Sequence, residues 1–272
     1  MSRVDVFVTC YNYGRYLRQC ATSVLDQSHR DLRLILVDDA SEDDTPGVSA
    51  EIAAADARVE VVRHSANLGH IATYNRCIDQ ARSALMLLLS ADDFLLPGAL
   101  DRASRAFDRD PVLGLVFGAC PAWSEGDPMP AAAADDGSPV PLTPAKFVPR
   151  LAAGNVVATA TAVVRTEVQQ RLGHYRPELP HAGDLEMWLR FALQSRIAYL
   201  QQAQAVYRRH DRNMSLAYDT RADLDQRMAS FRLHYDGIER GLAGGTEIAA
   251  RIRRWFEMKA RELDVPQVEP VA

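Results

Sequence analysis

Short apolar runs alternate with helically spaced apolar positions along the first 120 residues of the chain. The apolar, β-branched runs predict strands at residues 4–10, 32–37, 59–63, 85–89 and 113–120. Apolar residues that recur every three or four positions predict helices between them, at residues 16–27, 45–55, 71–81 and 97–107. Strands that alternate with helices of about ten residues indicate an α/β fold, with a mostly parallel sheet and right-handed crossovers.

The strand at residues 85–89 is the most informative of these. Its apolar residues fit burial on both faces of a parallel sheet, and they lead into Ser90 and the pair Asp92-Asp93. Adjacent carboxylates are costly to bury there unless a cation meets them, and ligands of open α/β sheets bind at that edge. One interpretation is a site for a divalent cation and a phosphate ligand. The other is an Asp-Asp turn before a helix that begins at Pro97.

A second acidic pair, Asp38 and Asp39, follows the strand at residues 32–37. Parallel strands place both pairs at the same edge of the sheet, which favours a ligand site over two unrelated turns. The first strand is not followed by GxGxxG, and GxxxxGK[ST] occurs nowhere in the chain. A nucleotide at this edge would therefore be held by carboxylates, through its base, its ribose and a bridging metal.

The second half of the chain predicts fewer regular elements. Proline-rich sequence between residues 121 and 149 indicates a surface loop, to which we assign no chemistry, with a short helix at residues 145–151. Strands are predicted at residues 155–165, where apolar and polar positions alternate, and at residues 197–200 and 204–207. From residue 221 helical spacing dominates, and the tail from Asp264 is expected to be disordered.

Asp184 stands where a helix N-cap is expected, after a proline-rich turn and before the apolar stripe of Leu185, Trp188 and Leu189. A cap is one explanation of this carboxylate. Capping and catalysis are compatible, because a carboxylate at a helix start stays ionised and fixed in direction. His210 lies in a basic segment, where a single histidine is more often a surface residue than a ligand.

Composition and charge exclude several classes of protein. Of 272 residues, 47% are apolar and 25% are charged, which is ordinary for a soluble globular protein. The net charge of −5 argues against a nucleic-acid partner held by phosphate attraction. The four cysteines form no CxxC pair, so zinc and disulfide frameworks are not expected. No signal peptide is visible, and no apolar run approaches the roughly 20 residues that span a bilayer, so a soluble cytoplasmic protein is expected.

The last predicted helix carries Arg251, Arg253, Arg254 and Lys259 beside its aromatic residues. A solvated face is the usual explanation of such a helix, and contact with anionic lipid or a partner is the alternative. The sequence neither requires nor excludes peripheral docking at the inner face of a membrane. The C-terminal helices could also pair two copies as a homodimer.

Several separated motifs between residues 4 and 215 resemble those of the family 2 inverting glycosyltransferases, which have the GT-A fold. In chain order they are V-F-V-T-C-Y-N, S-V-L-D-Q-S, L-I-L-V-D-D-A-S-E-D-D-T, N-L-G-H-I-A-T-Y-N, S-A-D-D, G-D-L-E-M-W-L-R and Y-R-R-H-D-R-N-M-S. Each motif alone is weak, but their order and spacing together are specific. The resemblance implies a Rossmann-like GT-A domain over residues 1–215, which binds a nucleotide sugar and carries the active site, and a helical extension over residues 216–272.

The resemblance also implies which residues bind the nucleotide of the donor. Thr9, Tyr11 and Asp39 would contact the base of a UDP- or dTDP-sugar. Asp39 would accept the imino N–H of uracil or thymine. The remaining residues of the nucleotide site would be Asn12, Asp38 and Asn67.

The metal and the catalytic base follow from the same resemblance. Asp92 is similar to the family's ribose-side carboxylate, and Asp93 to its ligand for Mg²⁺ or Mn²⁺, which would bridge to the diphosphate and stabilise its departing charge. His210 matches a position that some members use near the metal or the diphosphate. Asp184 is similar to the base that takes the proton of an acceptor hydroxyl as it attacks the anomeric carbon opposite the leaving group. Many members have Asp where this chain has Ser90, so metal binding would depend on Asp93, the diphosphate and His210. The resemblance leaves open which of Asp92 and Asp93 touches the ion.

The sequence thus predicts an active, metal-dependent, inverting glycosyltransferase. A nucleotidyltransferase is one alternative, although residues 10–15 are a poor version of the glycine-rich, basic loop of that class. A catalytically inactive nucleotide-sugar-binding or scaffold homologue is the other, and the presence of Asp39, Asp92, Asp93 and Asp184 together argues against it. The sequence does not determine the sugar or the acceptor, for which a polysaccharide, a glycolipid and a natural product all remain open.

Overall fold

The computed structural model of the chain describes residues 2–130 and 138–264. Among these residues the central sheet has eight strands, in the order β3-β2-β1-β4-β9-β6-β10-β8. They are β1 (Val4–Cys10), β2 (Leu32–Asp38), β3 (Val59–Arg63), β4 (Leu85–Ser90), β6 (Leu113–Ala119), β8 (Val140–Leu142), β9 (Val163–Arg165) and β10 (Arg196–Ala203). Strands β3, β2, β1 and β4 are parallel neighbours, β6 and β10 are parallel to each other, and β8 and β9 run antiparallel to their neighbours. The predicted α/β fold with a mostly parallel sheet is confirmed.

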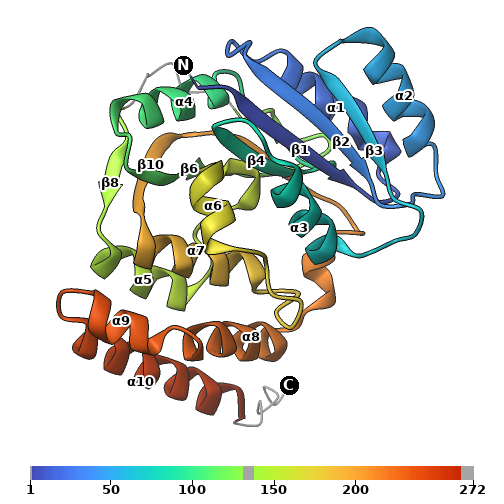
Figure 1. Ribbon diagram of the computed structural model, residues 1–272. Coiled ribbons are helices and arrows are strands. Elements are labelled where there is room, and N and C mark those ends of the chain that lie inside the picture. The colour runs from blue at the N-terminus through green and yellow to red at the C-terminus, as the bar shows by residue number, and fades with distance from the viewer. Residues whose placement is uncertain (1, 131–137, 265–272) are drawn as a thin grey trace.

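Helices cover both faces of the sheet (Figure 1). One face is covered by α1 (Gly14–Leu25), α2 (Thr45–Ala55) and α4 (Ala99–Arg109), and the other by α3 (His70–Gln80), α5 (Pro144–Ala153), α6 (Thr166–Leu172) and α7 (Gly183–Gln194). Successive residues of β1 enter opposite cores, with Val6 and Val8 on the first side and Phe7 on the second. Because both faces are buried, the central strands are apolar throughout, which is the pattern that predicted them.

The C-terminal helices α8 (Thr220–Arg232), α9 (Tyr235–Gly241) and α10 (Gly245–Asp264) form a further layer below α5 and α7 in Figure 1. Phe231, Ile252 and Phe256 belong to the same apolar core as Trp188 of α7. None of the described helices is both long and apolar enough to cross a membrane. Apart from Asp264, which ends α10, the tail that was expected to be disordered lies outside the described residues.

A small three-stranded sheet lies directly after the acidic pair that follows β4. It consists of β5 (Phe94–Leu95), β11 (Ala205–Arg209) and β7 (Ala122–Ser124), with β11 in the middle. This sheet corrects one prediction. The helix expected to begin at Pro97 begins at Ala99, because residues 94–95 pair with β11 and Gly98, with φ of 78°, makes a left-handed turn before the helix.

The segment between residues 121 and 149 is more ordered than predicted. It contains β7, β8 and α5, and the side chains of Trp123, Phe147 and Val148 are buried. The prediction of a surface loop is therefore wrong for these parts, because composition alone does not show which apolar residues among prolines find a core. The short helix predicted at residues 145–151 is confirmed by α5. Residues 131–137 lie outside the described part of the chain.

Residues 155–165 do not form the single strand that their alternation predicted. Thr159–Thr161 form a 3-10 helix, and β9 alone pairs, between β4 and β6. Because residues before β9 do not join the sheet, Asn155 and Thr159 are able to turn toward α7.

Candidate active site

The carboxyl ends of β2, β1 and β4 lie side by side at one edge of the sheet. Asp38 ends β2 and Asp39 follows it, while Asp92 and Asp93 come just after β4. Thr9 lies near the end of β1, the strand between them. The structure thus brings the two acidic pairs to the same edge of the sheet.

The loops that follow β1 and β2 are bonded to each other. The N–H of Asn12 donates to Ser41 Oγ at 2.9 Å, and the N–H of Glu42 donates to Asn12 Oδ1 at 2.8 Å. Asn12 and Ala40 have positive φ angles of 57° and 63°. A left-handed backbone costs a non-glycine residue roughly 1–2 kcal/mol, and such residues cluster at ligand sites. Tyr11, just before Asn12, is 42% exposed at this edge.

Asp39 is buried and accepts three hydrogen bonds. Its Oδ1 accepts from His64 Nδ1 at 2.8 Å and from the N–H of Leu68 at 2.9 Å, and its Oδ2 accepts from the N–H of Gly69 at 3.0 Å. Gly69 has φ of 81°, and its N–H also donates to Asn67 Oδ1 at 2.8 Å. The carboxylate is therefore fixed in orientation, and Oδ2 keeps one lone pair for a further donor.

Asp38 contacts its own loop and the neighbouring strand. Its Oδ1 accepts from the N–H of Ser41 at 2.8 Å, and its Oδ2 lies 3.1 Å from Nε of Arg63. The residue is buried. It supports the shape of the loop after β2, beside Asp39.

Asp92 and Asp93 are both buried and are held by Arg208 of β11. The N–H of Arg208 donates to Asp93 Oδ1 at 3.0 Å, and its Nε donates to the carbonyl oxygen of Asp92 at 2.8 Å. Burial, followed by the negative charge of Asp92, raises the pKa of Asp93 to about 8. One arginine thus holds the Asp93 carboxylate and the main chain of Asp92.

The guanidinium of Arg208 lies in an aromatic cage. Its central carbon is 4.7, 5.4 and 5.1 Å from the ring centroids of Tyr16, Phe94 and Trp123, and its Nη2 donates to Gln19 Oε1 at 2.5 Å. The permanently charged guanidinium of Arg208 is therefore shielded from water and lies next to the acidic pair. Trp123 belongs to the segment in which the sequence suggested no chemistry.

The donor atoms around Asp92 suit a hard cation. His210 Nε2 lies 3.1 Å from Asp92 Oδ2, and the His210 ring stacks on Tyr16 with centroids 5.1 Å apart. Asp92 Oδ1 is buried without a hydrogen-bond partner among the described residues. An orphaned carboxylate oxygen beside a second carboxylate fits Mg²⁺ or Mn²⁺. The described residues contain no group of three or more His, Cys, Asp or Glu side chains placed to hold a metal, so further ligands would come from a bound substrate.

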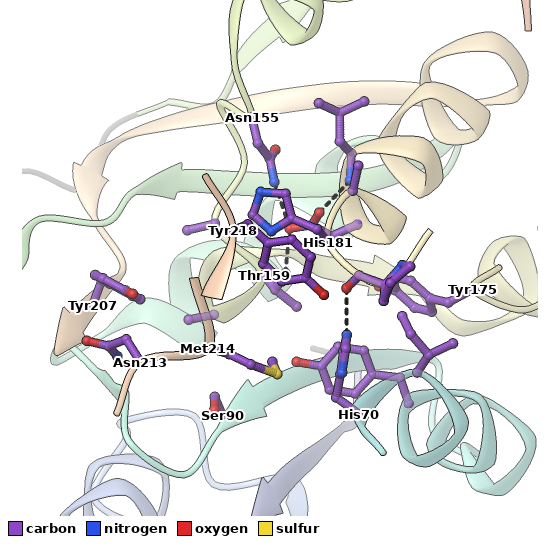
Figure 2. A pocket seen from close by; sticks show the side chains of 18 of the residues that line it. His70, Ser90, Asn155, Thr159, Tyr175, His181, Tyr207, Asn213, Met214 and Tyr218 are labelled. Atoms are coloured by element: carbon purple, nitrogen blue, oxygen red, sulfur yellow. Dashed lines mark hydrogen bonds between the residues drawn. The ribbon is translucent and has the colours of Figure 1, made fainter. Parts of the chain in front are cut away.

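A cavity of about 420 Å³ joins this edge of the sheet to α7 and α8 (Figure 2). Ser90, Asp92 and Asp93 line it from the end of β4, and Asp184 lines it from α7. The predicted residues that are not part of its lining are Thr9, Tyr11, Asn12, Asp38, Asp39, Asn67 and His210. The cavity thus brings together the acidic pair of β4 and Asp184, whereas the predicted nucleotide residues other than Asp92 lie outside its lining, most of them around the ends of β1 and β2.

Asp184 lies in the first turn of α7. The prediction that it is the N-cap is wrong, because the cap is Ala182 and the helix begins at Gly183, two residues earlier than predicted. Asp184 Oδ1 accepts from the N–H of Leu185 at 2.7 Å, and Oδ2 accepts from Asn155 Nδ2 at 2.7 Å. Burial raises the pKa of Asp184 to about 6, against the lowering effects of the Leu185 N–H, the charge of His181 and the Asn155 amide. Asp184 is therefore a firmly oriented carboxylate that is more basic than usual.

The sequence missed most of the cavity wall around Asp184. Asn155 and Thr159 come from the segment predicted as a strand, and Thr159 Oγ1 lies 3.5 Å from Asp184 Oδ2. Tyr218 comes from the segment just before α8, and no spacing in the sequence links it to the rest. Among these residues, only His181 could be suspected from the sequence, because it lies three residues before Asp184.

Comparison with known sequences assigns the first half of the chain to a family. Residues 5–130 match the family described as Glycosyl transferase family 2. An uncharacterized protein of Mycobacterium tuberculosis is 29% identical over 219 residues, which cover 76% of this chain and 67% of that protein. The putative glycosyltransferase EpsH of Bacillus subtilis is 31% identical over 102 residues, 38% of this chain and 29% of EpsH.

Solved structures share the fold. Residues 1–349 of TarS from S. aureus, in complex with UDP-GlcNAc, match with a TM-score of 0.73 at 19% identity, over 94% of this chain and 71% of that one. The mannosyltransferase PcManGT from Pyrobaculum calidifontis, in complex with GDP-Man and Mn²⁺, matches with a TM-score of 0.59 at 16% identity, over 95% of this chain and 84% of that one. The family match over residues 5–130, the glycosyltransferase relatives and the shared GT-A fold together support a family 2 glycosyltransferase.

Proposed function

We propose that this glycosyltransferase moves a sugar from a UDP- or dTDP-sugar to an acceptor hydroxyl, with inversion at the anomeric carbon and with the help of a divalent cation. One observation carries the proposal. A single cavity is lined both by the acidic pair Asp92-Asp93 and by Asp184, the carboxylate whose pKa is raised to about 6. A pair that can bind a metal and diphosphate, next to a base, is the arrangement that a one-step displacement needs.

Asp39 supports a donor whose base carries an imino N–H. Its Oδ2 retains one lone pair, and the three protein donors fix its direction. Uracil and thymine offer an N–H to such an acceptor, whereas cytosine would set a lone pair against it. The same edge carries the other nucleotide contacts that we propose, Thr9, Tyr11, Asn12, Asp38 and Asn67. The complex of TarS with UDP-GlcNAc is consistent with a uridine nucleotide.

The cation would be held by Asp93 and Asp92 together with oxygens of the donor diphosphate, and His210, whose Nε2 lies 3.1 Å from Asp92 Oδ2, would join them only with the donor in place. When bound, it would neutralise the charge that develops on the departing diphosphate. Arg208 holds the Asp93 carboxylate through its backbone N–H and the main chain of Asp92 through its guanidinium, and it adds a fixed positive charge behind them. The Mn²⁺ in the PcManGT complex supports a divalent cation in this fold.

Asp184 would act as the general base. The acceptor hydroxyl transfers its proton to the Asp184 carboxylate while its oxygen bonds to the anomeric carbon, and the bond from that carbon to the diphosphate oxygen breaks with its electron pair. Asn155 and the N–H of Leu185 hold the carboxylate during this step. A pKa of about 6 leaves Asp184 ionised at neutral pH yet basic enough to accept a proton. Attack opposite the leaving group inverts the anomeric centre.

Calorimetry tests the donor site without knowledge of the sugar. UDP, dTDP and CDP are titrated into the protein with Mn²⁺ present and then chelated. The proteins are the wild type, Asp93→Asn and the control Asp79→Asn, which changes an exposed carboxylate of α3. We expect UDP or dTDP to bind with Mn²⁺, CDP to bind far more weakly, and Asp93→Asn alone to lose the metal-dependent part. Absence of binding by every nucleotide would overturn the active-transferase proposal and favour an inactive homologue. Binding that ignores both Mn²⁺ and Asp93 would overturn the metal assignment.

A further inference from the structure

We propose that Tyr218 and His181 form an acceptor subsite beside Asp184, and that this subsite takes an electrically neutral saccharide. The inference rests on the proposed function, because it assigns the acceptor for the base described above. It concerns a wall of the cavity that lies outside residues 5–130, the part that matches the family.

The cavity continues past Asp184 to side chains on and next to α8. Tyr218, Asp223 and Arg227 line it, together with His181. Tyr218 and His181 line the same cavity as Asn155 and Thr159, whose side chains bond Asp184, and all four are labelled in Figure 2. An acceptor that reaches Asp184 from this direction would therefore pass Tyr218.

The two rings form a fixed aromatic platform. Their centroids are 4.1 Å apart with an interplanar angle of 22°. His181 Nε2 lies 2.9 Å from Asp223 Oδ1, and the backbone N–H of His181 donates to Gln226 Oε1 at 2.8 Å. An aromatic surface with a polar edge suits a sugar ring, whose C–H groups form an apolar face and whose hydroxyls need hydrogen-bond partners.

The charges on this wall indicate a neutral ligand. Among the described residues that line the cavity, Arg227 is the one arginine or lysine. Its Nη2 lies 2.6 Å from Asp223 Oδ2, and its Nη1 donates to the carbonyl oxygens of Ala152 and Ala153 at 3.2 and 3.1 Å. Arg227 and His181 are thus both paired with Asp223 within the protein, so a phosphate or carboxylate on the acceptor would meet Asp184 without a free cation on this wall.

Other polar side chains of the cavity can form hydrogen bonds with the hydroxyl groups of a saccharide acceptor. His70 and Asn155 line the same cavity, and His70 Nε2 lies 2.8 Å from the carbonyl oxygen of Pro180. The volume of about 420 Å³ falls within the 300–1,000 Å³ of typical small-molecule sites. Amide, imidazole and phenol groups at a small cavity favour a hydroxyl-rich acceptor without a net charge.

A glycan array tests the inference with the full chain. The printed probes are neutral oligosaccharides and their uronic-acid or phosphate-bearing counterparts, and binding is measured with UDP and Mn²⁺ present. The variants are Tyr218→Ala, Tyr218→Phe, which keeps the ring, and Leu216→Ala, a neighbouring control that is 68% exposed and does not line the cavity. Nucleotide binding by calorimetry accompanies each variant.

We expect the wild type to bind neutral glycans, Tyr218→Ala to lose about fivefold to tenfold in glycan affinity, and Tyr218→Phe and Leu216→Ala to stay near the wild type. All variants should bind the nucleotide normally. Glycan binding confined to the charged probes, glycan binding unaffected by Tyr218→Ala, or no glycan binding by a protein that binds nucleotide would each overturn the subsite. Failure of the wild type to bind any nucleotide would instead overturn the proposed function.

Asp223→Asn provides a second measurement that keeps both platform rings, because the asparagine oxygen can still accept from His181 Nε2. The substitution leaves the Arg227 guanidinium without its carboxylate partner, so the preference on the same array should shift toward the uronic-acid probes. An unchanged preference in a folded variant would contradict the argument from charge.

Discussion

The two walls of the cavity are built in different ways. On the wall at the end of β4, buried carboxylates are held by backbone groups and by one caged arginine, as Asp93 is by Arg208. On the wall at α7 and α8, side chains from distant segments pair with each other, as His181 does with Tyr218 and Asp223. The first construction fixes charges, which suits a metal and a diphosphate. The second presents adaptable polar and aromatic surface, which suits selection of an acceptor.

The largest effect is expected where the two walls meet, at Asp184. Asp184→Asn removes the proton acceptor and should lower the transfer rate by about 10³-fold, within the range of general-base contributions. Nucleotide binding should not change, because Asp184 is not among the groups that bind the nucleotide. Steady-state transfer from the donor identified by calorimetry checks this, and a variant that retains more than a tenth of the rate would remove Asp184 from the role of base.

The pH dependence of transfer should report the same carboxylate. Burial raises the pKa of Asp184 to about 6, and the base works only when ionised. The rate should therefore fall as pH decreases through about 6, by tenfold per pH unit below it, and level off above pH 7. A profile of kcat between pH 4.5 and 8 checks this; a fall centred near pH 4 would show that the Asp184 environment does not raise its pKa.

Arg208→Lys tests whether the β4 wall depends on geometry beyond charge. Lysine keeps the positive charge but cannot reach both the Asp92 carbonyl and Gln19, and it loses the planar contacts of the cage. Affinity for Mn²⁺ in the presence of UDP should fall by about 10- to 100-fold, as for other residues that orient metal ligands. Electron paramagnetic resonance of free Mn²⁺ measures the affinity.

The matched control is Arg209→Lys, the next residue on β11, which is exposed. It should bind Mn²⁺ with UDP like the wild type. Equal Mn²⁺ affinity for both folded variants would mean that Arg208 supports the fold and does not set the metal site. Circular dichroism and thermal melting establish that both variants fold.

The smallest effect is expected at His64, which donates to Asp39. His64→Leu removes one of three hydrogen bonds that orient the carboxylate, so UDP affinity should fall about threefold to tenfold. His64→Asn can keep a donor near the position of Nδ1 and should recover most of the affinity. Calorimetry distinguishes them, and equal weakening by both variants would indicate a packing role.

How far each wall of the cavity could be predicted from the sequence depends on which parts of the chain build it. The acidic edge of the sheet, which includes the β4 wall, could be predicted because Asp38-Asp39 and Asp92-Asp93 lie at the ends of apolar strands, and parallel strands bring their ends together. The cage around Arg208 could not, because Trp123 and Phe94 reach it through pairing of β5 and β7 with β11. Asn155 was missed because residues 155–165 alternate like one strand, although only β9 at their end pairs in the sheet.

The sequence by itself determined the alternation of strands and helices, the polar edge of the sheet and the carboxylates placed there. These depend on hydrophobic periodicity and on contacts within a few residues of each strand end. Only the tertiary structure decided that Asp184 shares a cavity with the β4 pair, and that Tyr218 and Arg227 of the C-terminal segment complete its wall. Such contacts join residues far apart in the chain, and they are set by how helices pack on the sheet, which no local pattern encodes.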